Sequence, residues 1–420
     1  MIKVFPSEIS GKISVISSKS FGHRELILAF LTGKEVLLKN LTVSEDILAT
    51  ISCLKALNAE ISETPNGITV KAGKIPEKAE IFCLESGTTL RFMLVLAAAL
   101  GMDCFVDGSE RLRERPIKDL VELLKEKGIS FSGDTLPFRM KGKLCAGKYE
   151  INGSVSSQFI SALLLALPYL GEECEIIIRG KTVSAGYIDI TLSAMEKYGI
   201  KVTKNPKGYL IGKQEYTPPV NSAGEKESEI EGDWSNAAFW IAAGALSSTD
   251  GLTVCGLNMS SVQGDKAIID VLKSMGGNIT QTKDGITAKK SKLTGMEIDA
   301  ENIPDLVPII AGTAAFAEGN TIIRNVERLR EKESDRILAV LKIVNALGGD
   351  AKYEDNAMII TGNSPVGGTV DSFNDHRIAM TAAVMGLACK NAVTISGENA
   401  VNKSYPKFFE LLKQIGGQNV

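Results

Sequence analysis

Several helix-like segments of this chain begin with cationic and hydroxyl side chains, which are residue types that bind anions. Lys19, Ser20 and Arg24 precede one apolar segment, and Arg91 and Arg377 stand at the start of two others. Free backbone N–H groups and the positive end of the helix dipole make a helix N-terminus a site for anions. A cation placed there opposes the dipole, so each one needs an anionic partner. The pattern predicts a shared anionic ligand, with acidic side chains of the protein as the alternative partners.

The hydroxyl residues and the other cations extend this pattern, and each of them also has a plainer interpretation. The hydroxyl and amide residues at such positions are Ser86, Thr88, Thr89, Ser154, Ser156, Ser157 and Gln158, and the further cations are Arg111, Arg113, Arg115, Lys118 and Lys403. A lone serine more often caps a helix than binds a ligand. Arginine suits phosphate and carboxylate because its planar fork donates two parallel hydrogen bonds, although some of these arginines will be solvated surface. The number of cations predicts two separate anionic groups.

The composition limits the kind of protein. A chain of 420 residues exceeds what one hydrophobic core usually serves, so we expect two domains. The net charge of −3 argues against a general nucleic-acid binder. Seven scattered cysteines without a CxxC pair favour reduced thiols in a cytosol, and two histidines exclude a histidine-rich metal centre. The N-terminus lacks the apolar core of a signal peptide, and the longest apolar run, 92–102, is too short to span a membrane.

One sequence pattern recurs along the chain: the end of a helix, then Gly or Asn, then a β-like run. The Gly or Asn falls at positions 58, 128, 199, 276, 348 and 416, which are 68 to 77 residues apart. Gly and Asn tolerate the left-handed conformation in which many helices stop. Any αβ protein repeats helix caps, but even spacing predicts six units of one size, three per domain. The acidic stretch 221–234 near the middle places a domain boundary near Glu231.

Several of the expected helices are apolar on nearly every side, including 160–170, 236–246, 306–317 and 378–388. A helix without a polar face must be covered all round. Strand-like runs such as 174–180 and 392–397 can provide the cover, with sheets outside and helices inside. The sequence therefore predicts a mixed αβ (α+β) fold. Neither GxGxxG nor GxxxxGK[ST] is present, so a doubly wound nucleotide-binding fold is not expected.

The order and spacing of nine motifs resemble the family of 5-enolpyruvylshikimate-3-phosphate synthases. The motifs are SKSFGHR, ESGTTLR, GSERLRERPI, GSVSSQFISALL, VSAGYIDIT, IPDLVPI, KESDR, NDHRIAM and NKSYPKFF. The resemblance covers essentially the whole chain. It implies a two-domain inside-out α/β prism of six βαβ-containing units, with residues 18–230 in the first domain and residues 1–17 and 231–420 in the second. It also implies substrates in the interdomain cleft and closure of the domains on them.

The resemblance implies a transferase of the shikimate pathway that moves the enolpyruvyl group of phosphoenolpyruvate to the 5-hydroxyl of shikimate 3-phosphate and releases phosphate, through a tetrahedral ketal. Shikimate 3-phosphate is expected to bind Lys19, Ser20, Arg24, Ser156, Ser157, Gln158, Ser184, Tyr187, Asp305 and Lys332. Phosphoenolpyruvate is expected to bind Lys19, Gly87, Arg115, Gln158, Arg336, Arg377 and Lys403. Asp305, Glu333 and Lys19 are the implied catalytic residues, with Asp305 taking the proton of the attacking hydroxyl and Glu333 sharing proton transfer at the methylene carbon.

The residue types suit this chemistry. Enolpyruvyl transfer protonates a carbon and later removes a proton, so it needs a carboxylate that can cycle. Fixed Arg and Lys can meet the charge of a leaving phosphate, so no metal or cofactor is expected. Both carboxylates keep a structural alternative, because Asp305 can cap the helix that follows it and Glu333 can pair with Lys332 or Arg336.

The match to the family's common pattern is not perfect, and three of the departures bear on the expected site. Glu85 places a carboxylate near two anionic substrates, so it must point away, be protonated or pair with an arginine. Phe92 replaces a proline whose surroundings influence binding of the herbicide glyphosate, which leaves inhibitor sensitivity open. Arg328 stands where Asn is common and is not assigned a role.

Two alternatives remain. One is the sister activity that uses UDP-N-acetylglucosamine as acceptor, which is disfavoured because Lys19-Ser20 replaces a Lys-Asn pair and no cysteine lies in the loop 108–116. The other is a non-catalytic binder of phosphorylated metabolites, which the presence of both Asp305 and Glu333 disfavours. We expect a cytoplasmic monomer that binds small-molecule substrates and neither nucleic acid nor membrane.

Overall fold

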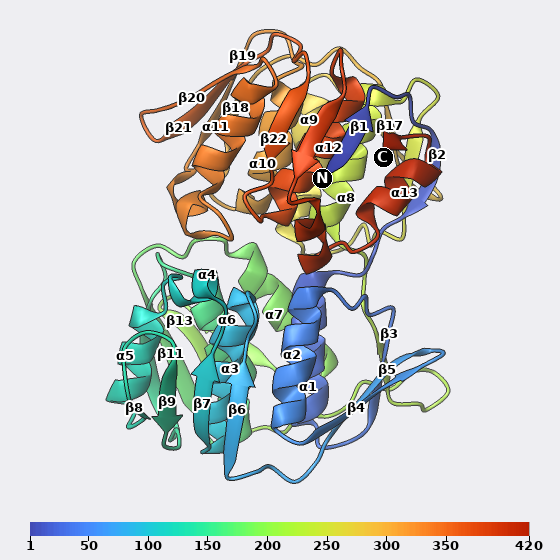
Figure 1. The fold of residues 1–420 in the computed structure, drawn as a ribbon. Helices are drawn as coiled ribbons and strands as arrows, with labels where there is room; N and C mark the ends of the chain where they lie inside the picture. The colour runs from blue at the N-terminus through green and yellow to red at the C-terminus, as the bar shows by residue number, and fades with distance from the viewer. Residues whose placement is uncertain (420) are drawn as a thin grey trace. The chain divides into compact units, whose positions relative to one another are not determined.

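The computed structural model describes residues 1–419, which divide into two compact units. The first unit is Ser17–Glu231, and the second unit combines Met1–Ile16 with the chain from Gly232 onward. In Figure 1 the first unit runs from blue to green, whereas the second runs from yellow to red and also contains the blue N-terminal strands.

The first unit contains seven α-helices and three four-stranded sheets. Its helices are α1 (Lys19–Leu31), α2 (Glu45–Ala56), α3 (Gly87–Leu100), α4 (Glu110–Arg113), α5 (Lys118–Glu126), α6 (Ser157–Ala166) and α7 (Gly186–Lys197). Its strands are β3 (Val36–Lys39), β4 (Ala59–Thr64), β5 (Gly67–Ala72), β6 (Lys78–Phe82), β7 (Asp103–Asp107), β8 (Ser130–Phe131), β9 (Phe138–Lys141), β10 (Gly147–Asn152), β11 (Cys174–Arg179), β12 (Val202–Asn205), β13 (Gly208–Ile211) and β14 (Glu227–Glu229).

The second unit has the same number of sheets. Its helices are α8 (Trp234–Ser247), α9 (Ile268–Ser274), α10 (Val307–Ala314), α11 (Arg336–Ala346), α12 (His376–Ala388) and α13 (Phe408–Gln414). Its strands are β1 (Ile2–Phe5), β2 (Gly11–Ser14), β15 (Leu252–Cys255), β16 (Asn278–Thr282), β17 (Gly285–Lys289), β18 (Glu297–Asp299), β19 (Asn320–Arg324), β20 (Asp350–Glu354), β21 (Ala357–Thr361), β22 (Gly368–Asp371), β23 (Val393–Ser396) and β24 (Gln418–Asn419).

All six sheets share one topology. In β6-β7-β9-β8, for example, β6 and β7 are parallel, and β9 pairs antiparallel with both β7 and β8. The sheet β22-β23-β1-β24 repeats this pattern, although it joins the first strand of the chain to the last. The six repeated units expected from the sequence are confirmed.

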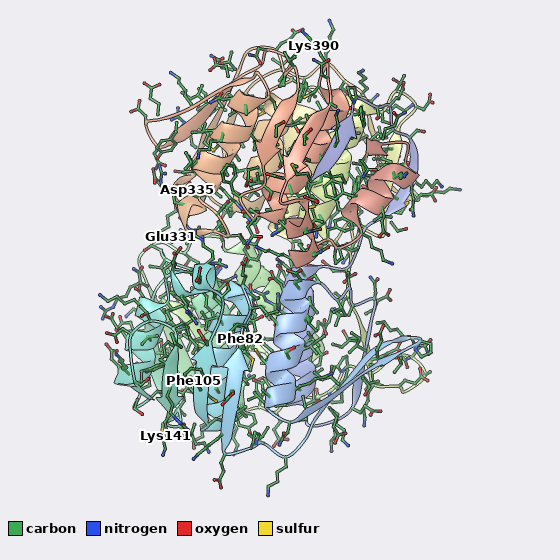
Figure 2. The ribbon with its side chains drawn as sticks, viewed as in Figure 1. Phe82, Phe105, Lys141, Glu331, Asp335 and Lys390 are labelled. Atoms are coloured by element: carbon green, nitrogen blue, oxygen red, sulfur yellow. The ribbon has the colours of Figure 1, made fainter. Side chains whose placement is uncertain are left out.

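The sheets form outer walls and the helices lie inside each unit. On β6 and β7, the side chains of Ile81 and Val106 are almost completely buried, whereas those of Phe82 and Phe105 are 51% and 43% exposed on the opposite face (Figure 2). Strand alternation therefore turns one face of the sheet to the core and the other to solvent. The helices α3, α6, α8, α10 and α12 are buried along nearly their whole length. The predicted mixed αβ fold with internal helices is confirmed.

The six Gly or Asn positions of the repeat all adopt positive φ, from 62° at Asn58 to 103° at Gly416. Each stands between the last helix of its repeat and the strand that follows, as expected for a left-handed helix stop. The starts of the internal helices are also as expected, because the side chains of Ser18, Ser86, Ser156 and Asp375 each accept a hydrogen bond from a backbone N–H of the first turn. Within residues 1–419, no helix has the length and apolar composition needed to cross a membrane.

Three repeats have a glycine with positive φ at the same position, the start of the second strand of a hairpin. Gly67, Gly208 and Gly285 open the strands β5, β13 and β17 with φ between 142° and 150°. A Cβ at Gly208 would lie 2.0 Å from the carbonyl oxygen of Ile176 on the neighbouring strand. Only glycine combines this backbone conformation with so close an approach.

We expect Gly208→Ala to lower the free energy of unfolding by about 2–5 kcal/mol, because backbone strain and steric overlap add. Urea unfolding monitored by circular dichroism measures the loss. Gly212→Ala is the matched control, because a Cβ there meets no atom within 4 Å. Equal midpoints for the two variants would show that the hairpin tolerates a side chain at Gly208.

Candidate active site

Helix α1 begins the cationic cluster of the first unit. Its first residue, Lys19, forms an ion pair of 2.7 Å between Nζ and Oδ2 of Asp46 on α2. Ser20 follows in the first turn, and its carbonyl accepts a hydrogen bond from Nη1 of Arg24. Asp46 is a residue that the sequence interpretation missed, because it lies 27 positions from Lys19 and no local pattern connects the two.

Arg24 is a buried guanidinium with uncharged partners. Its side chain donates to Thr191 Oγ1 at 2.7 Å, to Ser161 Oγ at 3.3 Å and to the carbonyl of Tyr187 at 3.0 Å. The guanidinium carbon also lies 5.1 Å from the centre of the Phe92 ring, within the range of a cation–π contact. Burial lowers the pKa of Arg24 to about 9, so the group remains charged at neutral pH. An anion would supply the charge compensation that these neutral partners do not.

The N-terminus of α3 brings two more arginines together. A Cβ built on Gly87 would lie 2.5 Å from Nη1 of Arg115 and 2.6 Å from Nη1 of Arg91, so both guanidinium groups approach the backbone of this first helical residue. Arg91 donates to Oε1 of Gln158 at 2.6 Å, and Gln158 in turn donates to Thr88 Oγ1 at 2.8 Å. The helix dipole and the two cations create a strongly positive site. The sequence interpretation noted Arg91 as a cation but gave it no ligand.

The hydroxyl residues of the first unit serve partly as structural groups. Ser156 caps α6 by accepting from the backbone N–H of Gln158 at 3.2 Å, and Ser157 is the first residue of that helix. Ser184 is buried and adopts φ 51°, a conformation that is rare for residues other than glycine. The carbonyl of Ser184 accepts a hydrogen bond from the backbone N–H of Tyr187. The carbonyl of Tyr187 in turn accepts a hydrogen bond from Arg24.

The second unit contains a compact cluster of carboxylates and cations around Asp305. Its Oδ1 lies 2.8 Å from Nη1 of Arg336 and 3.5 Å from Nζ of Lys332, and its Oδ2 lies 3.2 Å from Nη2 of Arg377. Asp305 belongs to a short 3₁₀ segment, and the helix α10 after it begins without a side-chain cap. The alternative interpretation of Asp305 as a helix cap is therefore wrong, because its carboxylate faces three cations instead.

Arg336 is the most heavily paired cation of this cluster. Besides Asp305, it contacts Oε2 of Glu333 at 2.7 Å and Oδ2 of Asp375 at 2.8 Å. Burial alone would lower the pKa of Arg336, but the three carboxylates outweigh burial and raise the pKa above its ordinary value. The expected alternative pairing of Glu333 with Arg336 is confirmed. Asp375, which also caps α12, was missed because a helix-capping role gives no sign of a second partner.

The side chains of the remaining predicted cations of the second unit, Arg377 and Lys403, donate hydrogen bonds to backbone carbonyls. Nη1 of Arg377 also donates to the carbonyl of Asp305 at 3.1 Å. Nζ of Lys403 donates to the carbonyl of Asn374 at 2.6 Å, and Asn374 itself adopts φ 53° just before α12. Burial lowers the pKa of Lys332 from its ordinary value, and the neighbouring Asp305 charge opposes this effect. All six predicted residues of the second unit are thus anchored near the N-terminal ends of α10, α11 and α12 or in the segments beside them.

A second buried carboxyl group lies close enough to Asp305 to sense its charge. Asp265 is 5% exposed and accepts a hydrogen bond from the hydroxyl of Ser235 in α8. Burial, followed by the negative charge of Asp305, raises the pKa of Asp265 to about 6, while Arg377 acts in the opposite direction. No motif in the sequence pointed to Asp265, because its effect depends only on its position in space.

The predicted site residues divide into a first-unit group and a second-unit group. The first-unit group contains Lys19, Ser20, Arg24, Gly87, Arg115, Ser156, Ser157, Gln158, Ser184 and Tyr187, and the second-unit group contains Asp305, Lys332, Glu333, Arg336, Arg377 and Lys403. Direct contacts connect Arg24 with Ser20 and Tyr187, and Asp305 with three cations. Both groups gather positive charge at the N-terminal ends of internal helices.

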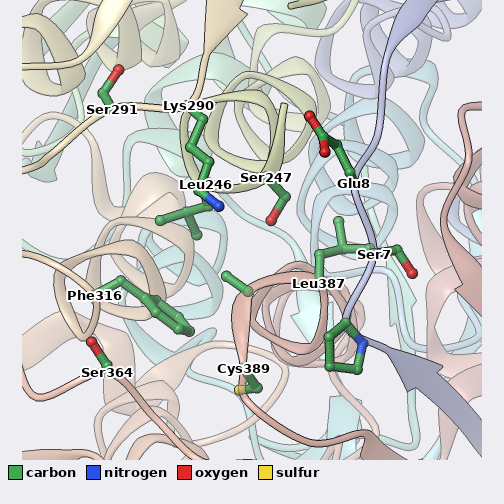
Figure 3. A pocket seen from close by; sticks show the side chains of 12 residues that line it. Ser7, Glu8, Leu246, Ser247, Lys290, Ser291, Phe316, Ser364, Leu387 and Cys389 are labelled. Carbon is green, nitrogen blue, oxygen red and sulfur yellow. The ribbon is translucent and has the colours of Figure 1, made fainter. Parts of the chain in front are cut away.

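A separate pocket of about 490 Å³ lies at the other end of two internal helices of the second unit (Figure 3). Its walls include Ser247 at the C-terminal end of α8 and Leu387 near the C-terminal end of α12. Helix C-termini carry partial negative charge and do not favour anions. None of the predicted site residues lines this pocket, so it is distinct from the two candidate groups.

Comparison with known proteins identifies close relatives. A family model described as EPSP synthase (3-phosphoshikimate 1-carboxyvinyltransferase) matches residues 5–412. The chain is 40% identical over 427 residues to the 3-phosphoshikimate 1-carboxyvinyltransferase of Clostridium acetobutylicum, covering 99% of this chain and 97% of the relative. It is 39% identical over 432 residues to the protein of the same name from Clostridium novyi, with the same coverage.

Two solved structures share the fold. An EPSP synthase from Acinetobacter baumannii superposes with a TM-score of 0.82 at 24% identity, covering 100% of this chain and 99% of that one. The enolpyruvyl transferase NikO from Streptomyces tendae superposes with a TM-score of 0.77 at 17% identity, covering 100% and 98%. At these identities the structures support the fold alone.

The raised pKa of Asp265 predicts a pH-dependent stability. The folded state holds the proton of this carboxyl more tightly than the unfolded chain, so its contribution to stability is present at low pH and is lost as pH rises through about 6. Above that pH the ionised, buried group costs up to about 3 kcal/mol, as the shift from the ordinary Asp value implies. We expect Asp265→Asn to be more stable than the parent at pH 8, with a gain that shrinks as pH falls from 6 toward 4.

Urea unfolding of both proteins across this pH range measures the difference. Asp250→Asn, at an exposed position of the same unit, is the control and should follow the parent at every pH. A stability difference between Asp265→Asn and the parent that stays constant with pH would contradict the raised pKa.

Proposed function

Since the chain belongs to the EPSP synthase (3-phosphoshikimate 1-carboxyvinyltransferase) family, we propose that its two charged groups together transfer the enolpyruvyl group of phosphoenolpyruvate to the 5-hydroxyl of shikimate 3-phosphate. The protein is a transferase of the shikimate pathway, which leads to the aromatic amino acids. Phosphate is the second product, and a tetrahedral ketal links the two half-reactions.

The observation that carries the proposal is the buried guanidinium of Arg24, whose described partners are uncharged. A nearby anion strongly stabilises a buried cation, and the phosphate group of shikimate 3-phosphate is such an anion. Lys19 and the first turns of α1 and α6 supply further donors. The proposed shikimate 3-phosphate residues are Lys19, Ser20, Arg24, Ser156, Ser157, Gln158, Ser184, Tyr187, Asp305 and Lys332.

Phosphoenolpyruvate carries a phosphate and a carboxylate, and each of these anionic groups can bind a separate group of cations. The positive site where Arg115 and Arg91 meet the backbone of Gly87 supports binding of one anionic group there. The complete proposed set is Lys19, Gly87, Arg115, Gln158, Arg336, Arg377 and Lys403, to which the contacts of Arg91 add one residue. Fixed cations of this kind stabilise the charge that develops on a leaving phosphate.

Asp305 is the proposed base for the 5-hydroxyl, and Glu333 and Lys19 complete the catalytic set. Asp305 and Glu333 both neutralise Arg336. An anionic substrate that takes over Arg336 and Arg377 would release the Asp305 carboxylate from these contacts, so that it can accept a proton. Binding of phosphoenolpyruvate would thereby free Asp305 to act as the base.

The two groups belong to different units, so the proposal places the substrates in a cleft between residues 18–230 and the remainder of the chain. Closure of that cleft would exclude water and bring both sets of cations to the substrates. We also propose that the protein is a monomer and works in the cytoplasm.

The activity is tested by phosphate release in the presence of both substrates. We expect release that depends on shikimate 3-phosphate and on phosphoenolpyruvate, and no release when UDP-N-acetylglucosamine replaces the first. Titration with shikimate 3-phosphate alone should show binding before phosphoenolpyruvate is added. Tight binding of both compounds without phosphate release would favour a non-catalytic binder instead.

The role of Asp305 is tested by Asp305→Asn, which keeps the shape of the side chain and removes the basic carboxylate. We expect kcat to fall by about 10²–10⁴-fold, the usual contribution of general base catalysis. The dissociation constant of shikimate 3-phosphate should change far less, because most of its proposed contacts lie in the first unit. Asp250→Asn should keep the parent's kcat, and unchanged turnover in Asp305→Asn would remove Asp305 as the base.

A further inference from the structure

A buried hydrogen-bond chain connects the two helix N-termini that carry the cations of the first unit. Nδ1 of His23 on α1 lies 2.7 Å from Oγ1 of Thr50 on α2, and this hydroxyl lies 2.7 Å from Oγ1 of Thr89 on α3. Thr89 donates to Oγ of Ser86, the cap of α3, at 2.8 Å. All four side chains are at most 1% exposed. The hydrogen-bond chain therefore runs from α1 through α2 to α3 without contact with solvent.

Counting protons assigns a direction to this hydrogen-bond chain. A hydroxyl group has one proton to donate. Thr89 uses its proton on Ser86, so it must accept from Thr50, and Thr50 must then accept from His23. His23 is thus protonated on Nδ1. Its Nε2 is buried without a hydrogen-bond partner.

The surroundings of His23 keep the second ring nitrogen unprotonated. Burial lowers the pKa of His23 well below its ordinary value, and the charges of Lys19 and Arg24 lower it further. The imidazole is neutral at physiological pH. Both neighbouring cations are proposed ligands of shikimate 3-phosphate, and they lie within four residues of His23 on the same helix.

The other end of the hydrogen-bond chain meets the proposed phosphoenolpyruvate site. Ser86 accepts from both the hydroxyl and the backbone N–H of Thr89, so its position fixes the first turn of α3. Gly87, where the two arginines meet, is the next residue. Helix α2 packs against both α1 and α3, so Thr50 is the only member that must bridge two other helices.

We propose that His23 is a positioning residue which, through Thr50, Thr89 and Ser86, holds the N-terminus of α3 in register with the N-terminus of α1. The hydrogen-bond chain sets the spacing between the cations for phosphoenolpyruvate and those for shikimate 3-phosphate. This inference rests on the proposed function for its ligands, whereas the hydrogen-bond chain itself does not depend on that function.

Nitrogen NMR of the full chain tests the proton assignment directly. The protein has only two histidines, so labelling with ¹⁵N-histidine gives two imidazole rings to assign, and His23→Asn identifies the signals of His23. We expect His23 to be the neutral tautomer protonated at Nδ1 at pH 7. A tautomer protonated at Nε2, or a doubly protonated ring, would overturn the direction of the hydrogen-bond chain and with it the proposal.

Thr50→Val tests the positioning role, because it breaks the hydrogen-bond chain in the middle without a large change of volume. We expect KM for phosphoenolpyruvate, measured at saturating shikimate 3-phosphate, to rise about three- to tenfold, the equivalent of one lost buried hydrogen bond. Thr50→Ser retains the hydroxyl and should restore the parent value. Thr313→Val is the matched control, since this buried helical threonine donates only within its own helix, to the carbonyl of Ile309.

A second variant keeps the test decisive if Thr50→Val does not fold. The side-chain amide of His23→Asn can replace the Nδ1 donor, whereas His23→Phe cannot, so the asparagine variant should stay close to the parent KM and the phenylalanine variant should not. Combining His23→Phe with Thr50→Val should raise KM no further than either change alone, as expected for residues that act as a unit. Equal KM in Thr50→Val and Thr313→Val, or additive effects in the double variant, would contradict the proposal.

The outcomes also separate this inference from the proposed function. A parent protein that releases no phosphate would refute the proposed function, while the NMR result would still decide the state of the hydrogen-bond chain. An active parent whose KM is unaffected by Thr50→Val would refute the positioning role alone.

Discussion

The structure depends on how it compensates cations that are withdrawn from water. A guanidinium in a protein interior is costly unless charge or hydrogen bonds replace its hydration. The two units solve this problem differently. Arg336 is surrounded by three carboxylates, whereas Arg24 is held by hydroxyl and carbonyl dipoles and by the face of Phe92. The first solution neutralises the charge of Arg336 with opposite charges, whereas the second surrounds Arg24 with uncharged groups.

The architecture explains why these cations can gather at all. Each unit places its apolar helices inside three sheets, so the helix N-termini converge while their sides remain covered. Caps such as Ser86 and Asp375 satisfy the first backbone N–H groups and fix where each helix starts. Polar side chains can then occupy the first turns without disturbing the apolar core. The repeated unit therefore supplies a rigid frame, and the residues at its helix starts supply the chemistry.

Two residues of the charged groups and their surroundings gain a physical explanation from this frame. Phe92 replaces the expected proline and is buried with its ring against Arg24, so it supports a cation of the proposed site. Asp375 combines two duties, since it caps α12 and pairs with Arg336. Such double use ties the geometry of a binding residue to the start of a helix, which makes both more rigid.

The sequence alone determined the local features of this protein. The helix starts, the left-handed stops from Asn58 to Gly416, the six repeats and the buried helices follow from propensity, capping and hydrophobic pattern, all of which act between near neighbours. Only the tertiary structure decided the partners of the cations. Asp46 lies 27 residues from Lys19, Asp375 lies 39 from Arg336, and Thr191 lies 167 from Arg24. A charge's partner depends on distance in space, which local rules do not encode, so the sequence could name the cations but not what holds them.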